Sequence, residues 1–340
     1  AKIQTQKGPS YGYEYATLGD IHKATRKALL AEGLVITSAP VEIEGGMAVE
    51  TTIAHAGSGE TISQRCPLRL ASGGDMKALM KREDAPAIRD TVILFGAMAL
   101  FAGLGIALWP SWWSAPFWLA YGVLYGSAMD SRWHECGHGT AFRTGKYNDW
   151  VYQIASFCMV RNPVSWRWSH ARHHTDTVIV GRDPEIVAMR PPALFRIVLN
   201  VFGILDAVIG WKRMILNAMG KLDAEEITYI PESEHHKVAK VARIWVLTYA
   251  TTILTAILAQ SLLPLMLIGL PRLYGAWHHV MTGILQHAGL ADNVIDHRLN
   301  SRTVYMNPVS RFIYWNMNFH IEHHMFPLVL CYKSAEHCQE

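Results

Sequence analysis

Residues 91–138 read TVILFGAMALFAGLGIALWPSWWSAPFWLAYGVLYGSAMDSRWHECGH. The first 39 of them, Thr91 to Met129, contain no Asp, Glu, Lys or Arg. As a single helix, this run would reach nearly 60 Å at about 1.5 Å per residue, twice the roughly 30 Å of a bilayer's hydrocarbon core. The WPSWW segment at 109–113 interrupts the run with a proline, and its tryptophans favour the membrane–water interface. We therefore predict a tight hairpin of two membrane spans that leads into a histidine motif.

A second uncharged run covers Ile244 to Pro271, 28 residues with an interruption at residues 260–261. This run is long for one span and short for two. We predict a second hairpin, whose return helix continues past Arg272 toward Trp277. The apolar segment from Ala193 to Trp211 contains two charged residues, which favours an interfacial or half-buried helix.

The placement of charge predicts the orientation in the membrane. The net charge is only +3, which gives no reason to expect nucleic-acid binding. Basic residues precede the first span and follow the second, whereas the turn between the spans has none. The positive-inside rule then puts the first histidine motif on the cytoplasmic side. The five cysteines show no pairing pattern, as expected for a reduced, cytoplasm-facing protein. The basic residues are Lys77, Lys81, Arg82 and Arg89 before the spans, and Arg132, Arg143 and Lys146 after them.

Three histidine motifs are the main candidates for chemistry. They have the spacings H-x-x-x-H, H-x-x-H-H and H-x-x-H-H. On a helix, residues three or four apart share a face, so each motif forms a one-turn metal clamp. Together with a ninth candidate after the second uncharged run, they suit two ions with four or five nitrogens each. An all-imidazole environment favours iron, copper or zinc over magnesium or calcium. The nine candidate ligands are His134, His138, His170, His173, His174, His287, His320, His323 and His324.

Convergence of these motifs constrains the path of the chain. The first hairpin returns the chain to its starting side, which places the first two motifs together. If the run from Ile244 to Pro271 were one span, His287 and the third motif would emerge on the opposite side. Convergence therefore requires the second hairpin.

Other histidines and the tryptophans have weaker signals. His278 and His279 could replace or support His287 as a ligand. Four histidines lie in polar stretches and are expected to face solvent: His235, His236, His297 and His337. Four tryptophans could line an acyl channel or anchor the protein at the membrane interface: Trp166, Trp168, Trp277 and Trp315.

A rival interpretation begins at His134, because HECGH also satisfies H-E-x-x-H. That pattern on a helix forms a zinc protease site, with the glutamate as general base. Intramembrane proteases of this kind typically take a third ligand from an Asp within a later apolar segment. The later uncharged run contains none, and the other two motifs would have no role.

The amino-terminal part has mixed composition and no chemical motif. A helical pattern covers Ile21–Glu32, and two strand-like runs, Leu34–Ile43 and Met47–His55, are joined by a glycine-containing turn. Through YATLGD, TTIAHA and Cys66-Pro67-Leu68, residues 10–77 resemble a truncated form of the single-strand annealing proteins called the ERF family. This resemblance implies single-stranded DNA annealing as a remote alternative function, although a fused gene explains the join equally well.

The part from residue 77 to 330 resembles the membrane fatty acid desaturase and hydroxylase family. The resemblance rests on HECGH, WSHARHH and NFHIEHHMFP, which match the family's three histidine boxes in order and spacing. It implies a non-haem centre of two iron ions, two membrane hairpins and a cytoplasmic active site. It implies the eight box histidines as ligands, and His287 as the family's extra histidine before the third box.

The same resemblance implies an O2- and electron-dependent attack on an unactivated C–H bond of a lipid or fatty acyl chain. A desaturase is expected, with a hydroxylase on the same scaffold as the alternative. No fused haem or ferredoxin domain is recognised, so we expect a separate ferredoxin- or cytochrome-type electron carrier. Four acidic residues are candidates to orient the imidazoles: Asp176, Asp183, Glu185 and Glu322.

We therefore predict a mainly α, integral membrane protein with two transmembrane hairpins and a cytoplasmic histidine-rich cap, preceded by a small α+β segment. The predicted division is residues 1–76 for that segment, 77–330 for the desaturase-like domain and 331–340 for a short tail. The tail is unlike the family's helical ending and is compatible with an incomplete carboxyl terminus. The predicted location is the bacterial inner membrane, and nucleic acid is not an expected partner.

Overall fold

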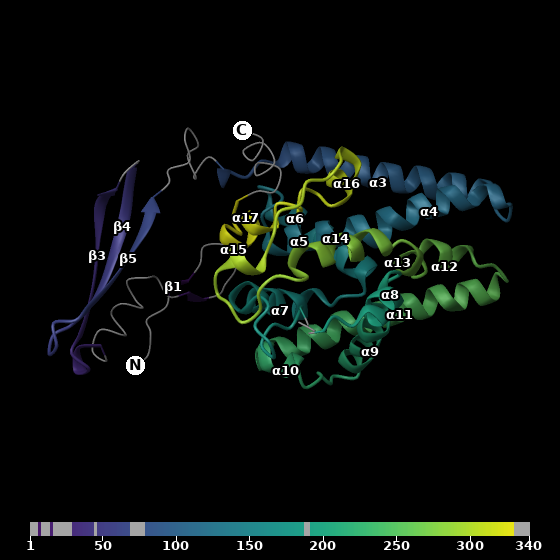
Figure 1. Cartoon of the computed structure of the whole chain (residues 1–340). Coiled ribbons are helices and arrows are strands. Elements are labelled where there is room, and N and C mark those ends of the chain that lie inside the picture. Colours follow the sequence, from purple (N-terminus) through teal and green to yellow (C-terminus); the bar gives the residue numbers. More distant parts are fainter. Residues whose placement is uncertain are drawn as a thin grey trace. The chain divides into compact units, whose positions relative to one another are not determined.

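The computed structural model describes residues 6–7, 14–15, 29–43, 46–68, 79–186 and 191–329. The chain divides into two compact units, Ala1–Asp75 and Met76–Glu340. Helices dominate the second unit, and the described part of the first contains the strands of two small sheets (Figure 1).

The amino-terminal unit contains a three-stranded antiparallel sheet. Its strands β3 (Leu34–Ile43) and β4 (Gly46–His55) confirm the two strands predicted from sequence. The strand β5 (Thr61–Leu68) pairs only with β4 among the described residues, and it was not predicted from the sequence. Its Pro67 cannot donate a backbone hydrogen bond, and an edge strand is the place where a sheet tolerates proline. The short strands β1 (Gln6–Lys7) and β2 (Glu14–Tyr15) pair separately, and most of the predicted helix over 21–32 lies outside the described residues.

The first predicted reversal is observed. Helix α3 (Asp84–Ala107) is followed by a turn and by the 3-10 helix η1 (Trp112–Ser114). The chain then runs back through α4 (Ala115–Val123), the π-helix η2 (Leu124–Ala128) and α5 (Met129–His138) without leaving the helical conformation. The end of α5 thus carries the first histidine motif to the base of the hairpin (Figure 1).

The second reversal is also observed, but its return leg is not one helix. Helix α11 (Glu232–Leu258) is followed by α12 (Leu263–Leu267), α13 (Pro271–Tyr274) and α14 (Trp277–His287). The return leg breaks before Pro271, where Gly269 has a φ of +98° that other residues rarely adopt. The predicted path is therefore right, and the predicted continuous return helix is wrong.

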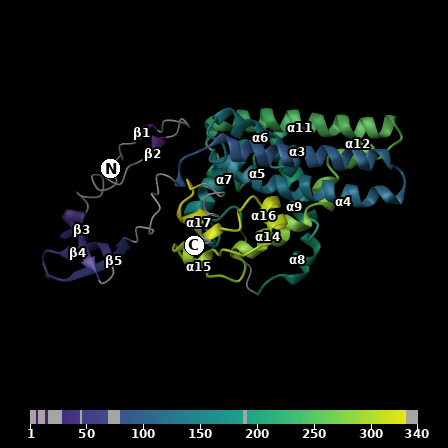
Figure 2. The ribbon, with the colours of Figure 1, turned by 90° about the horizontal axis from the view of Figure 1, so that it is seen from above.

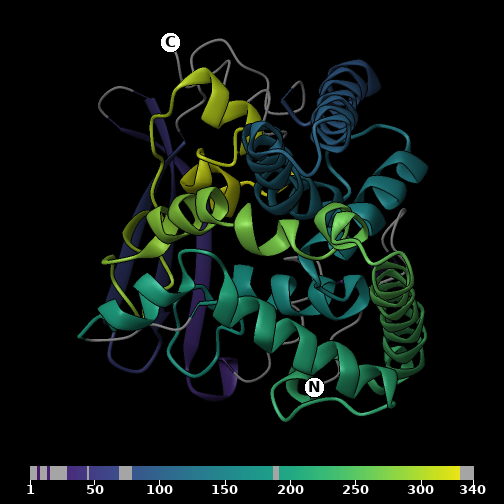
Figure 3. The ribbon, with the colours of Figure 1, turned by 90° about the vertical axis from the view of Figure 1, so that its right-hand side faces the viewer.

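The two hairpins pack against each other through glycines and one serine. A β-carbon on Gly275 would lie 1.7 Å from the carbonyl oxygen of Gly122, so no larger residue fits at this contact. The Ser127 hydroxyl, within the π-helix, donates to the Gly275 carbonyl (2.6 Å) and accepts from the backbone N–H of His279 (2.9 Å). Both hairpins turn at the same end of the unit (Figure 2), and α3 in blue and α11 in green are seen end-on in Figure 3. This contact holds the two return legs side by side, so the histidines at their ends lie at the same end of the unit.

Two described helices, α3 and α11, are long and apolar enough to cross a membrane. The first return leg is one continuous helical run in which a π-helix separates α4 from α5, whereas the second is broken into the shorter helices α12, α13 and α14. The pair α8 (Leu194–Asn200) and α9 (Ile204–Ala218) would make a third candidate span if its two helices are taken together, but it bends by 74°. The remaining helices are α6 (Gly145–Met159), α7 (Pro163–Asp176), α10 (Glu226–Tyr229), α15 (His297–Asn300), α16 (Pro308–Ile313) and α17 (His320–Met325).

Candidate metal centre

Four helices contribute the nine candidate ligands. The first motif lies on α5, the second on α7 and the third on α17, while His287 is the last residue of α14. Asn162 caps α7, since its side chain accepts from the backbone N–H groups of Val164 and Ser165. The structure thus brings together all nine histidines that the sequence singled out.

The nine side chains form two groups, and in each group the candidate ligand atoms lie within 4.8 Å of one another. All nine side chains are buried or half-buried. The first group contains five histidines and the second four, as predicted for two ions. Their members are His134, His138, His170, His174 and His323 in the first group, and His173, His287, His320 and His324 in the second.

The groups do not coincide with the sequence motifs. On α7, His170 and His174 belong to the first group, whereas His173 belongs to the second. On α17 the division is reversed, because only His323 joins the first group. Adjacent helical residues point about 100° apart, so a histidine pair at consecutive positions can serve two centres. The prediction that each motif is one clamp is therefore wrong for the second and third motifs, each of which is shared between the groups.

The spacing between the ring nitrogens fits a transition metal. The Nε2 atoms of His170 and His138 lie 3.0 Å apart, and those of His320 and His287 lie 2.9 Å apart. Two nitrogens at right angles around an ion, each about 2.1 Å from it, would be separated by about 3.0 Å. The Nε2 atom of His134 is buried and has no hydrogen-bond partner among the described residues. Both observations fit metal ligation through Nε2.

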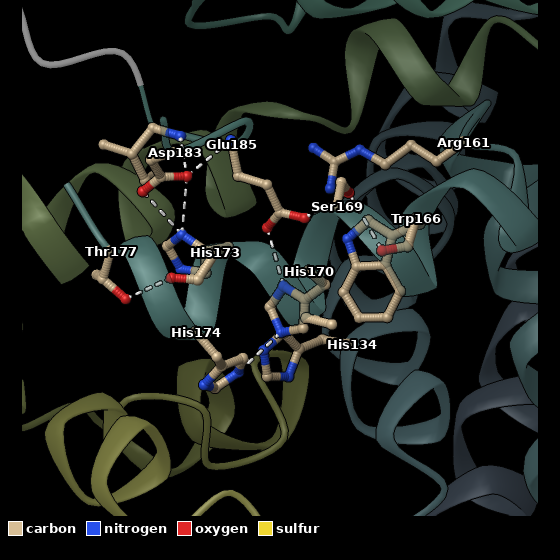
Figure 4. A network of polar contacts seen from close by, with 12 residues as sticks. His134, Arg161, Trp166, Ser169, His170, His173, His174, Thr177, Asp183 and Glu185 are labelled. Carbon is tan, nitrogen blue, oxygen red and sulfur yellow. Dashed lines mark hydrogen bonds and ion pairs between the residues drawn. The ribbon is translucent and has the colours of Figure 1, made fainter. Parts of the chain in front are cut away.

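Two of the four predicted carboxylates orient histidines through the opposite ring nitrogen, Nδ1. Asp183 accepts from Nδ1 of His173 (2.9 Å), and Glu185 accepts from Nδ1 of His170 (2.9 Å). In Figure 4 both carboxylates point at these rings. The Nδ1 of His287 lies 2.8 Å from the carbonyl oxygen of Asn300. A proton held on Nδ1 leaves Nε2 free to bind a metal, and such partners fix the ring orientation.

The other two predicted carboxylates have different partners. Asp176 forms ion pairs with Arg182 (2.8 Å) and Arg172 (3.6 Å), and Glu322 accepts a hydrogen bond from Thr303. A further orienting carboxylate, outside the four predicted ones, is Glu135, which lies 3.1 Å from Nδ1 of His134. Its position beside the first histidine of HECGH is a sequence signal that could have identified it. No such sequence signal marks the contact between His287 and Asn300, because a backbone carbonyl oxygen makes it and any residue could supply one.

Burial keeps most of these imidazoles neutral. It lowers the pKa of His170, His320 and His324 well below the usual value, and neighbouring imidazoles lower it further. It lowers the pKa of His287 to about 4. A neutral imidazole is the form that binds metal.

The two carboxylates shift in opposite directions. Burial raises the pKa of Glu185 above its usual value. At Asp183, burial acts in the same direction but is outweighed by hydrogen bonds from His173 and from backbone N–H groups, so the pKa is lowered. The same pair raises the pKa of His173, although burial alone would lower it. Asp183 and His173 therefore shift each other's pKa in the directions expected of an ion pair.

An aromatic stack supports the first group. The ring of Trp166 stacks on His170, with a centroid separation of 4.2 Å, and the ring centroid of Trp133 lies 3.8 Å from that of Trp166. A β-carbon on Gly137 would lie 2.0 Å from the Trp166 ring, so the glycine of HECGH makes room for it. Trp166 and Trp315 are 6% and 4% exposed and are buried in the protein, so an interfacial anchoring role is wrong for them.

The other histidines lie outside the two groups. His278 and His279 are buried, and His278 lies 3.3 Å from the Ser310 hydroxyl. His297 was expected to face solvent, but it is half-buried with its ring centroid 5.1 Å from that of His324. His235 is likewise half-buried, with its ring 3.2 Å from the Ile230 carbonyl oxygen. His236 is exposed, as predicted, and His337 lies outside the described residues.

Comparison with known proteins agrees with this geometry. The family model described as "Fatty acid desaturase" matches residues 107–337, which include all nine histidines. An acyl-lipid (9+3)-(E)-desaturase of Dimorphotheca sinuata is 26% identical over 258 residues, covering 67% of this chain and 67% of the relative. The chloroplastic sn-2 acyl-lipid omega-3 desaturase (ferredoxin) of Arabidopsis thaliana is 24% identical over 274 residues, covering 73% and 58%. An sn-1 acyl-lipid omega-3 desaturase (ferredoxin) of Synechocystis sp. is 32% identical over 95 residues, covering 28% and 25%.

Proposed function

The chain belongs to the fatty acid desaturase family, and from this premise we propose that it introduces a double bond into a fatty acyl chain of a lipid. The proposed reaction consumes O2 and electrons from a separate carrier protein, and two iron ions bound by the nine histidines are the proposed cofactor. The enzyme class, an oxidoreductase of the desaturase type, follows from the family itself.

The observation that carries this proposal is the pair of buried imidazole groups. Their nitrogens are spaced as the ligands of a transition metal would be, and burial keeps most of the rings neutral. When bound, the iron ions supply the activation of O2 that hydrogen removal from an alkyl chain requires. The protein supplies the rest. Asp183 and Glu185 hold two rings in the orientation that presents Nε2, and the surrounding side chains exclude water.

The hairpins support the proposed membrane arrangement. We propose that α3 and α11 cross the bilayer outward and that the return legs α4–α5 and α12–α14 cross it back. The ends of α5 and α14, which carry His134, His138 and His287, then lie outside the bilayer. Both legs then end at the metal centre, so an acyl chain can reach it from the bilayer. The basic residues Arg143 and Lys146 follow the first return leg, which supports a cytoplasmic position for the centre. The bacterial inner membrane remains a prediction.

The electron donor is proposed by class. Two of the similar desaturases carry "ferredoxin" in their names. We propose a ferredoxin- or cytochrome-type carrier for this chain, docking on the side of the metal centre that faces away from the bilayer.

Lipid analysis tests the proposal. The full chain is expressed in a lipid-producing bacterial host, and the acyl chains are compared by mass spectrometry with those of a host carrying an empty vector. Desaturation yields a product two mass units lighter than its precursor, whereas hydroxylation yields a product one oxygen atom heavier and would assign the alternative reaction. The iron-loaded protein is also supplied with a ferredoxin and its reductase. If the lipid profile then stays unchanged, both the desaturase and the hydroxylase proposals are contradicted.

Two variants make the test specific for the metal centre. His173→Ala removes a member of the second group and should abolish the product. His279→Ala removes a histidine of similar burial that belongs to neither group, so it should leave product formation largely intact. Equal loss in both variants would point to general destabilisation instead.

A further inference from the structure

The turn between α16 and α17 has an unfavourable backbone conformation. Trp315 and Asn316 are consecutive non-glycine residues with φ angles of +47° and +60°. In this left-handed region the β-carbon crowds the backbone, and only glycine and, less often, asparagine or aspartate adopt it readily. A tryptophan followed by a second left-handed residue therefore costs free energy. Such a conformation persists only where the surrounding structure determines it.

Contacts on both sides hold the turn in place. The indole Nε1 of Trp315 donates to a carboxylate oxygen of Asp90 on α3 (3.1 Å). The side-chain oxygen of Asn316 accepts from Nε and Nη2 of Arg311 (3.3 and 3.2 Å), and its backbone N–H donates to the Arg311 carbonyl (3.1 Å). The ring of Trp315 also lies 4.9 Å from the guanidinium carbon of Arg132. The turn is thus fixed to α3, α5 and α16 together.

Arg132 is the central residue of this junction. It is 0% exposed, and it lies on α5 two positions before His134. Its Nη1 donates to the carbonyl oxygens of Phe312 (2.9 Å) and Ile313 (2.7 Å), the last two residues of α16. Carbonyls at the end of a helix have no partner within the helix, and a cation there interacts favourably with the helix dipole.

Burial of this guanidinium is costly. Its Nε and Nη2 have no hydrogen-bond partner among the described residues, although the rings of Phe312 and Trp315 lie close to it. A buried charge without full compensation is expensive, so an apolar residue of similar length would be favoured if packing alone mattered. What the arginine adds is a fixed connection from the helix of the first motif to the end of α16.

We propose that Arg132 is a positioning residue that holds the turn at Trp315 and thereby sets where the third histidine motif meets the first. Only three residues separate Asn316 from His320, the first histidine of α17, so a displacement of the turn passes directly to that helix. The inference rests on the proposed role of the histidines as metal ligands. Arg132 itself contacts no histidine of either group through a hydrogen bond in the described structure.

Metal binding by purified full-length variants tests this inference. Arg132→Met removes the charge and both contacts to α16, whereas Arg132→Lys retains a cation that can reach the carbonyls. Arg243→Met is the control. The exposed Arg243 also donates to the last carbonyl of a helix, Ala218 of α9 (2.8 Å), and α9 carries none of the nine histidines. Co²⁺ serves as the probe. Its affinity is measured by competition with a chelator, and its visible absorption reports on ligand geometry.

We expect Arg132→Met to weaken Co²⁺ binding by about 10–100-fold and to change the absorption spectrum, since loss of an orienting contact typically has this effect. Arg132→Lys should recover part of the affinity, and Arg243→Met should bind as the unaltered protein does. Unchanged affinity and spectrum in Arg132→Met would overturn the inference, as would an equal loss in Arg132→Met and Arg243→Met. If the unaltered protein binds no metal, the proposed function fails rather than this inference.

The turn itself provides a second test should Arg132→Met fail to fold. Asn316→Gly and Asn316→Ala lose the same side-chain contacts with Arg311, but only glycine adopts a φ of +60° without strain. Metal affinity should therefore fall further in Asn316→Ala than in Asn316→Gly. Identical affinities in the two variants would contradict the idea that the turn's conformation sets the metal site.

Discussion

Replacing Asp183 by asparagine tests the contact in which a buried carboxylate orients His173. The carboxylate side chain is 0% exposed and contacts Nδ1 of His173 with both oxygens. One oxygen also accepts from the backbone N–H groups of Glu185 (2.8 Å) and Ile186 (3.1 Å), and the other from that of Val178 (2.8 Å). Asparagine keeps the shape of this side chain but can accept at only one of the two positions.

Two consequences follow from this geometry. If the amide oxygen stays with Glu185 and Ile186, the amide NH₂ faces the N–H of Val178, and a buried donor without a partner costs about 1–3 kcal/mol of folding stability. The NH₂ group also faces His173 and favours the tautomer that accepts at Nδ1, which moves the ring proton to Nε2. That proton blocks the atom proposed to bind the metal. We expect metal affinity of the second group to fall by about 10–100-fold.

The assay is metal analysis of purified protein, together with thermal unfolding of the metal-free form. Asp183→Asn should retain the ion of the first group and lose the ion of the second under moderate chelator competition. Asp176→Asn is the control, because Asp176 is the last residue of α7, the helix before the loop of Asp183, and forms ion pairs with Arg172 and Arg182 instead of contacting a histidine. Two ions held as tightly in Asp183→Asn as in the unaltered protein would refute the reasoning.

Three further outcomes follow from the packing and the pKa shifts. In Gly137→Ala, the added methyl group would lie 2.0 Å from the ring of Trp166 and displace it, so we expect a loss of about 1–3 kcal/mol in thermal unfolding together with weaker metal binding. In Gly275→Ala, the methyl group would lie 1.7 Å from a backbone oxygen of α4, and we expect a lower unfolding midpoint. In Gly283→Ala, the methyl group would meet no atom within 4 Å beyond its chain neighbours and the backbone of its own helix, so the unfolding midpoint should match or exceed that of the unaltered protein. The opposite ranking of the two variants would disprove the close contact at Gly275. Because burial holds the pKa of His287 at about 4 when folded, against 6.5 when exposed, only the unfolded chain takes up this proton as the pH falls between those values. The metal-free protein should therefore lose up to about 3 kcal/mol of stability from His287 across this window, and a pH-independent denaturation midpoint would rule this out.

Much of the fold could be predicted from the sequence because its signals are local. The uncharged run from Thr91 to Met129 is too long for one span, and the tryptophans and proline at 109–113 mark the turn that the structure shows. The division of the second return leg could have been anticipated, because Gly269 and Pro271 are visible in the sequence. The strand β5 is harder to predict, because it contains a proline and its position at the sheet edge depends on the pairing of its neighbours.

The sequence could not predict which carboxylates orient the histidines. Asp176, Asp183 and Glu185 all follow the second motif closely, and nothing in their spacing separates them. Asp183 and Glu185 reach histidines because the loop after α7 folds back over that helix, whereas Asp176 is held by two arginines. Which acid reaches which ring is decided by the backbone path after the helix, and that path is fixed by distant contacts such as the hydrogen bond from Asn293 to Val178.

The sequence by itself determined which nine histidines are the candidate metal ligands, and where the chain reverses so that all nine lie at one end of the two hairpins. Both depend on short-range properties: the spacing of imidazoles along a helix and the length of uncharged runs. Only the tertiary structure decided how the nine divide, with His170 and His174 in one group and His173 in the other. A helix fixes the angles between its own side chains, but the packing of α7 against α5 and α17 fixes which neighbour each side chain meets.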